Sequence, residues 1–180
     1  MSWYISGLQQ NHFRIATNLI YSKRTLLSRY EIAGANGMQI LSVPVKHTDQ
    51  KQALKEVQIA FVEPWLKNHK TALESAYKKS PFYEYYDYKI LPVLQQETAL
   101  LQLALMGLKT VHQLLYLEDI PLQFHNSEII RYHEDFIHPV PEYPQVFSDR
   151  NGFKNNMSVL DLLFNLGPDA GDYLRGAISK

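Results

Sequence analysis

The segment that decides the fold reads Asn155-Asn156-Met157-Ser158-Val159-Leu160-Asp161-Leu162-Leu163-Phe164-Asn165-Leu166-Gly167-Pro168. Its apolar residues follow one another so closely that they predict a helix buried on nearly all sides. Ser158 is expected to cap this helix by accepting the backbone N–H of Asp161, while the Asp161 carboxylate reaches back to Ser158. Gly167 and Pro168 then end the helix. The segment therefore predicts a core helix and assigns Asp161 to capping rather than to catalysis.

Upstream of this helix, the first third of the chain carries the β signals. Residues 28–33 and 38–45 flank Gly34-Ala35-Asn36-Gly37, in which Asn-Gly supplies the positive φ angles of a tight turn, so a β-hairpin is predicted. Further strands are predicted at residues 13–21 and 56–62.

Helical patterns dominate after these strands. Pro64 suits a first helical position, and the spacing of apolar residues predicts a helix over 64–79 and a long central helix near 92–116. A last helix is expected to begin near Pro168. This order indicates an α+β fold in one domain, residues 1–180, with a small, mainly antiparallel sheet in the N-terminal third packed with helices.

Composition excludes several classes of function. Lys and Arg number 18 against 18 for Asp and Glu, so no net positive field favours nucleic acid, and no nucleic-acid partner is expected. The sequence has no cysteine, which excludes a thiol nucleophile and thiolate zinc sites. The first residues lack a signal-peptide pattern, and no apolar run is long enough to span a bilayer. These features predict a cytoplasmic protein with no membrane span.

Short motifs in a fixed order resemble the WbqC-like family along most of the chain. The closing helix and the residues before it carry the most specific part of the resemblance. The matching segments are Lys23 to Gly37, Leu41-Ser42-Val43-Pro44-Val45, Trp65 with His69, Tyr77 with Ser80-Pro81-Phe82, Ile137-His138-Pro139, Tyr143-Pro144-Gln145-Val146-Phe147, Gly152-Phe153, Asn156-Met157-Ser158 and Asp161-Leu162-Leu163-Phe164-Asn165.

The resemblance implies work in bacterial surface-polysaccharide or O-antigen assembly. The implied partner is a small molecule, either an activated sugar or an acyl or aminoacyl donor, and the implied enzyme is a transferase without a cofactor. A non-catalytic binding or scaffolding protein on the same fold is the alternative. It is motivated by Leu27-Ser28-Arg29, where family members usually show Arg-Asn-Arg, or Asn-Arg with a flanking aromatic, and by the family's opening element, which this sequence lacks. An exposed aromatic surface at residues 83–88 would favour this alternative.

The N-terminus also departs from the family pattern. Ser2-Trp3-Tyr4 resembles the residues that directly follow the family's opening strand and its Tyr-x-Pro-Pro element. We therefore expect a missing strand, which leaves either an uncovered groove or an unpaired strand edge beside residues 13–21 or the hairpin. Because an unpaired edge can pair with a second copy, a homodimer is predicted.

Two histidines are the candidate catalytic residues, His69 and His138, because an imidazole can act as a general acid or base near neutral pH. The alternative for His69 and its neighbour Trp65 is a place in the core. No metal site is predicted, since His133 and His138 lack further ligands at a compatible spacing.

The candidate substrate-binding residues are Arg29, Trp65, Tyr77, Tyr143 and Asn156. A guanidinium at position 29 can hold a phosphate or carboxylate through two hydrogen bonds, and an indole can stack on a sugar or base. The other reading of Arg29 is a surface arginine paired with a carboxylate. All of these side chains are expected to converge on one concave pocket.

Overall fold

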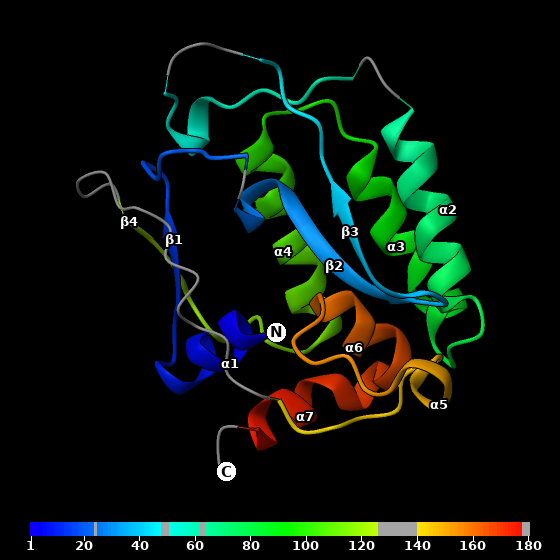
Figure 1. Cartoon of the computed structure of the whole chain (residues 1–180). Coiled ribbons are helices and arrows are strands. Elements are labelled where there is room, and N and C mark those ends of the chain that lie inside the picture. The colour runs from blue at the N-terminus through cyan, green and yellow to red at the C-terminus, as the bar shows by residue number, and fades with distance from the viewer. Residues whose placement is uncertain (24, 48–50, 62–63, 126–139, 178–180) are drawn as a thin grey trace.

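The computed structural model describes residues 1–23, 25–47, 51–61, 64–125 and 140–177. They form helices and two small two-stranded sheets, which confirms the predicted α+β class (Figure 1). The strands are β1 (Phe13–Ala16), β2 (Arg29–Gly34), β3 (Gly37–Ser42) and β4 (Leu122–His125), and the helices are α1 (Ser2–Gln9), α2 (Trp65–Tyr77), α3 (Tyr83–Leu94), α4 (Leu100–Leu114), α5 (Ser148–Asn151), α6 (Val159–Leu166) and α7 (Ala170–Gly176).

The predicted hairpin is present as β2 and β3. These strands pair antiparallel from Arg29 opposite Ser42 to Gly34 opposite Gly37. Only Gly37 in this turn has a positive φ, 101°, whereas Asn36 does not. The expectation that both Asn36 and Gly37 take positive φ angles was therefore wrong, although glycine still supplies the freedom that the turn needs.

The second sheet pairs β1 with β4 in parallel, with Phe13 opposite Leu122. It brings a strand from beyond residue 120 beside the N-terminal part of the chain, so the strands are not confined to the first third. Short parallel pairings of this kind leave little trace in the sequence, because β4 follows Pro121 and spans only four residues.

The other predicted strands are shorter than expected or irregular. β1 ends at Ala16, and residues 17–18 form a turn. The segment predicted as a strand from residue 56 has no regular strand among its described residues. Ile59 makes a single bridge with Val45, and Gln58 makes one with Ala99. Because successive residues pair with different neighbours, no ladder forms.

Two helices occupy the region where one was predicted to start at Pro92. Pro92 lies in the last turn of α3, and the long central helix α4 begins only at Leu100. The backbone at Ala99 is extended, and the Leu100 N–H donates to the carbonyl of Val57 at 3.0 Å. Contact with the segment after β3 therefore fixes the start of α4.

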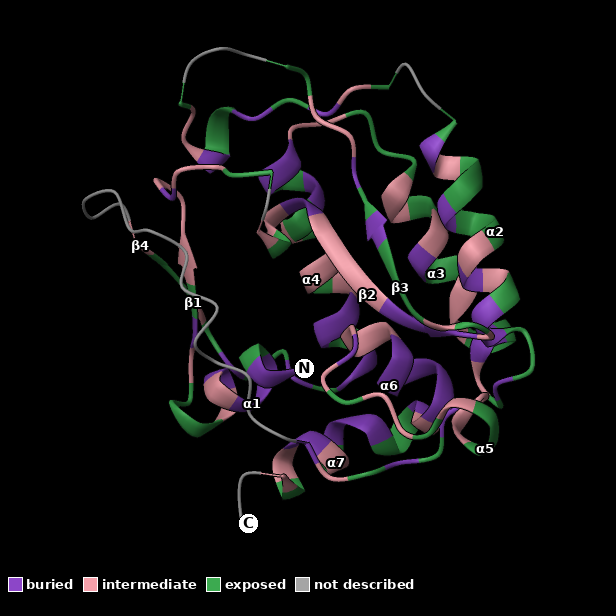
Figure 2. Cartoon of the chain, viewed as in Figure 1, coloured by how far each residue is buried: buried purple, intermediate pink, exposed green. Residues whose placement is uncertain are grey.

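The buried side chains form two neighbouring clusters. The larger one surrounds α6, on which Leu162, Leu163 and Phe164 are almost completely buried, as the periodicity predicted. The smaller one contains Trp65 and the first turn of α4, and Leu94 packs against both clusters. In Figure 2 most of α6 is coloured as buried.

The hairpin crosses the helical layer. In Figure 1 β2 passes in front of α4 and runs on toward the end of α2, while α6 lies below it. Contacts between β2 and both α2 and α6 support this placement. The first residues of β2 therefore lie close to α3, α4 and the start of α6, and a cavity lies between these elements.

Candidate functional site

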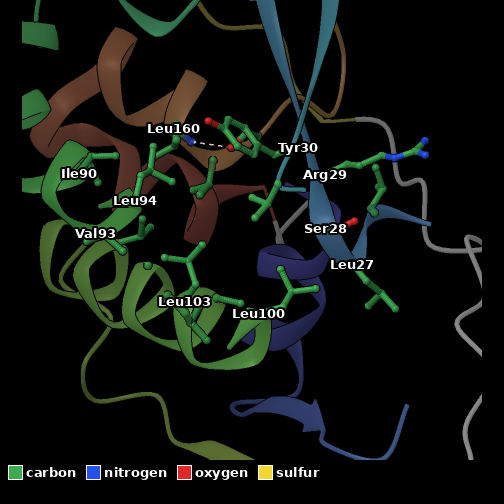
Figure 3. A pocket seen from close by; sticks show the side chains of 18 of the residues that line it. Leu27, Ser28, Arg29, Tyr30, Ile90, Val93, Leu94, Leu100, Leu103 and Leu160 are labelled. Carbon is green, nitrogen blue, oxygen red and sulfur yellow. Dashed lines mark hydrogen bonds between the residues drawn. The ribbon is translucent and has the colours of Figure 1, made fainter. Parts of the chain in front are cut away.

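An apolar cavity of about 330 Å³ lies at this junction (Figure 3). That volume is at the lower end of the range of small-molecule sites, about 300–1,000 Å³. One wall comes from residues 26–30, which turn from a short 3₁₀ helix into β2. The apolar residues of the helical walls are Ile90, Val93 and Leu94 of α3, Leu100, Leu103, Ala104, Leu108 and Val111 of α4, and Val159 and Leu160 of α6.

Arg29 is the cationic residue of the lining. Its side chain extends away from the leucines of the helical walls, so the guanidinium lies at the outer end of the cavity (Figure 3). The guanidinium donates to the backbone carbonyl of Lys23, and within the described residues it makes no ion pair. Among the described residues no carboxylate neutralises this charge, so the guanidinium can receive an anionic group.

Tyr30 follows Arg29 and also lines the cavity. Its hydroxyl lies 3.0 Å from Nδ1 of His69, whose Nε2 lies 3.1 Å from the carbonyl oxygen of Ser42. A carbonyl can only accept, so Nε2 carries the proton. Nδ1 of the neutral ring is then the acceptor, and the Tyr30 hydroxyl donates to it.

His69 itself is buried and does not line the cavity. Burial lowers the pKa of His69, because it penalises the imidazolium, and the hydrogen bond to the Ser42 carbonyl partly opposes this shift. His69 is thus held neutral behind Tyr30, where it can act on a ligand only through the tyrosine.

Trp65 lies in the smaller core cluster, not in the cavity wall. Its ring meets His69 edge-to-face at 5.1 Å between centroids and also contacts Phe61. The indole N–H is buried and has no hydrogen-bond partner in the described part of the chain. Trp65 and His69 therefore form one aromatic group beneath the hairpin.

Tyr77 and Tyr143 meet at the Asp161 carboxylate, away from the cavity. The Tyr77 hydroxyl donates to Oδ1 at 2.8 Å, and the Tyr143 hydroxyl donates to Oδ2 at 2.5 Å. The Gln145 side-chain amide donates to Oδ2 at 2.8 Å. Tyr77 also accepts the backbone N–H of Ala33 at 3.2 Å. These bonds join α2, β2, α6 and the segment before α5.

This network corrects the role predicted for Asp161. The side chain is 0% exposed, and its carboxylate bonds Tyr77, Tyr143 and Gln145 instead of reaching back to Ser158. Ser158 does cap α6, but through Leu160 N–H at 3.3 Å. Burial raises the pKa of Asp161, while the three donated hydrogen bonds oppose that shift. The sequence did not predict this network, because Ser158 followed by Asp161 before an apolar run is the pattern of a capping box whether or not distant donors bind the carboxylate.

Asn156 has a local structural role. Its backbone is in the left-handed region, with φ 56°, and its Oδ1 accepts from both the backbone N–H and the hydroxyl of Ser2 at 2.8 Å. It thereby ties the start of α1 to the segment before α6. Asn156 does not line the cavity, although the neighbouring Ser158 does.

Of the predicted site residues that the structure describes, Arg29 alone lines the cavity. His69 lies behind the cavity wall, where it is hydrogen-bonded to the lining residue Tyr30. His138 lies outside the described residues. No sequence pattern singled out Tyr30. The apolar walls could have been predicted from the wide apolar face of the central helix. That face was interpreted only as the side of a helix that packs in the core.

Two further properties bear on function. Within the described ranges no group of three or more His, Asp or Glu side chains is placed to hold a metal ion. In the same ranges each helix is too short or too polar to cross a membrane.

Comparison with known proteins identified one family. The model described as WbqC-like protein family matches residues 4–135 and 121–173, which together cover most of the chain. Searches of curated proteins and of solved structures gave no significant match.

Proposed function

Because this chain belongs to the WbqC-like protein family, we propose that it binds the acyl group of an activated donor used in bacterial surface-polysaccharide assembly, and that the reaction is an acyl transfer in the cytoplasm. The observation that carries the proposal is the apolar cavity of about 330 Å³ with Arg29 at its outer end.

The chemistry of the lining favours an acyl donor over an activated sugar. A bound sugar needs hydrogen-bond partners for most of its hydroxyls, because a buried polar group without a partner costs about 1–3 kcal/mol. The helical walls of this cavity instead present Leu, Ile and Val side chains. An alkyl chain gains about 0.8 kcal/mol for each CH₂ that it buries there.

Arg29 supplies the polar end of the site. A carboxylate or a phosphate of the donor's carrier group can bind its guanidinium, while the alkyl chain enters between α3 and α4. This arrangement gives the ligand one orientation, with the anionic end at the rim and the apolar end inside.

The test uses octanoate as the probe and isothermal titration calorimetry as the measurement. We expect saturable binding, weakened about tenfold in Arg29→Gln and less sensitive to salt in that variant, because one charge-assisted contact is lost. Gly107→Leu is the cavity-blocking variant. Gly107 lines the cavity, and a Cβ there meets only Val93 Cγ1, at 3.9 Å, so the helix can accept the side chain while the cavity loses its space.

Binding that is unchanged in Gly107→Leu would show that octanoate binds elsewhere and would contradict the proposal. No binding to the unmodified protein would contradict it as well. Tyr85→Phe is the control, since Tyr85 lies on α3 but is 67% exposed and does not line the cavity.

A non-catalytic binding protein is the second candidate. It is favoured by the exposure of Tyr85 and Tyr88 on α3, 67% and 62%, and by the burial of His69. The two candidates differ in turnover. An octanoyl thioester with amino- or hydroxyl-bearing sugar acceptors should release free thiol if the protein is a transferase, whereas tight binding with no thiol release supports the second candidate.

A further inference from the structure

The polar groups of the cavity indicate more about the chemistry of its ligand than its apolar walls do. Tyr30 and Tyr4 both line it, and apart from Trp3, Ser28, Arg29 and Ser158 the rest of the lining is aliphatic or glycine. Phenolic oxygens in such surroundings need hydrogen-bond partners, so the partners that they have, and those that they lack, indicate what a ligand must offer.

Tyr30 can act only as an acceptor toward a ligand. Its proton is used in the hydrogen bond to Nδ1 of His69, at 3.0 Å. His69 cannot release that proton by switching tautomers, because its Nε2–H is held by the Ser42 carbonyl at 3.1 Å. The remaining lone pair of the Tyr30 oxygen has no partner among the described residues, and a lone pair can bind only a donor.

Tyr4 is the second phenolic residue of the lining, and its side chain is 7% exposed. A ligand without a hydrogen-bond donor would leave the free lone pair of the Tyr30 oxygen unused, whereas a ligand hydroxyl can donate to it.

We propose that Tyr30 is a specificity-determining residue that selects acyl groups carrying a hydroxyl over plain acyl groups, with His69 as the positioning residue that fixes Tyr30 as an acceptor. This inference rests on the proposed function, since it names the class of acyl group that the cavity takes. The ligand hydroxyl donates to the Tyr30 oxygen while the alkyl chain packs against α3 and α4.

The experiment compares matched probes on the full chain by calorimetry. The probes are octanoate and its counterparts with a hydroxyl near the carboxylate or at the far end of the chain. The methoxy counterpart of each hydroxy acid keeps the oxygen but has no proton to donate. We expect one of the hydroxy acids to bind about three- to tenfold more tightly than octanoate, and more tightly than its own methoxy counterpart by the same factor. This factor corresponds to the net contribution of one neutral hydrogen bond to the binding free energy.

The variant that tests the residue is Tyr30→Phe, which removes the oxygen and keeps the ring. We expect the ratio of hydroxy-acid affinity to octanoate affinity to fall to about one in this variant, because the acceptor oxygen is lost. The ratio of the two affinities is the decisive readout, because structural damage would weaken both probes equally. Tyr85→Phe should keep the ratio unchanged.

The outcomes separate the two proposals. Binding of octanoate without any preference for a hydroxy acid, or a preference that persists in Tyr30→Phe, overturns this inference and leaves the proposed function standing. Equal binding of the hydroxy and methoxy acids also overturns it. Failure of every probe to bind overturns the proposed function and this inference together.

Discussion

The Tyr77 hydroxyl donates to Oδ1 of Asp161 at 2.8 Å, although 84 residues separate the two in the sequence. This bond ties α2 to α6 at the centre of the larger core cluster, where both side chains are almost completely buried. Tyr77 was predicted to bind substrate and Asp161 to cap a helix, but together they form one structural unit. The contribution of this unit to stability can be measured.

Asp161→Ala is expected to lower the free energy of unfolding by about 3 kcal/mol or more, because three buried donors lose their acceptor at once. Urea denaturation followed by tyrosine and tryptophan fluorescence measures this change. Asp161→Asn keeps one acceptor oxygen and the side-chain volume, so it should cost less. A loss below about 1 kcal/mol for the alanine variant would contradict the role assigned to the carboxylate.

His69 gives a pH dependence of defined sign. Its pKa in the folded protein lies below the ordinary value of 6.5, so its contribution to stability is present above that pH and is lost as the pH falls through the folded pKa. We expect the unmodified protein to lose more stability than His69→Gln between about pH 8 and about pH 5.

The glutamine variant is a suited control for the histidine, because its amide can donate to the Ser42 carbonyl and accept from Tyr30 without titrating. Burial also lowers the pKa of His112, and that contribution stays in both proteins. Asp161, with its raised pKa, acts in the opposite direction and also stays in both. Identical pH profiles of the two proteins would show that His69 does not titrate as a buried neutral group.

Two helical glycines are predicted to respond oppositely to alanine. Gly107→Ala should raise the free energy of unfolding by up to about 1 kcal/mol, since the new Cβ meets only Val93 Cγ1 at 3.9 Å and alanine favours helix. Gly171→Ala should lower it, because its Cβ would lie 2.3 Å from the backbone carbonyl oxygen of Leu115. Thermal unfolding of the two variants side by side tests this, and equal shifts would refute the packing of α7 against Leu115.

Asn156 can be tested in its structural role with two substitutions. Asn156→Ala loses the two hydrogen bonds from Ser2 at the start of α1 and places alanine at a positive φ, so it is expected to lower the free energy of unfolding by about 1–2 kcal/mol. Asn156→Gly keeps the backbone freedom and loses only these hydrogen bonds, so it should lower the free energy of unfolding by less. Denaturant midpoints give the comparison, and octanoate affinity should be equal in both folded variants because Asn156 does not line the cavity.

Much of the local structure could be predicted from the sequence. The hairpin followed from a glycine at a position that needs positive φ, and the burial of α6 followed from apolar residues on every side. The helix α2 began where Pro64 indicated. In each case the residues that form the sequence pattern and the element that they predict lie within a few positions of one another. The spacing of residue types along the chain was therefore enough to predict the element.

The candidate site could be predicted only in part. Arg29 was identified from its residue type and the family resemblance, and it does line the cavity. Tyr30 was missed because its partner, His69, lies 39 residues away and no local pattern joins them. The start of α4 at Leu100 was missed for the same reason, since the Leu100 N–H bonds the carbonyl of Val57 in a distant segment.

The sequence by itself determined the hairpin, the buried helix α6 and the family of this protein. The tertiary structure decided which polar groups meet. Whether Asp161 caps a helix or accepts from two tyrosines, and which group receives the proton of the Tyr30 hydroxyl, depends on side chains brought in from distant segments. Such contacts form when the apolar faces of those segments pack together, and no spacing along the chain records them.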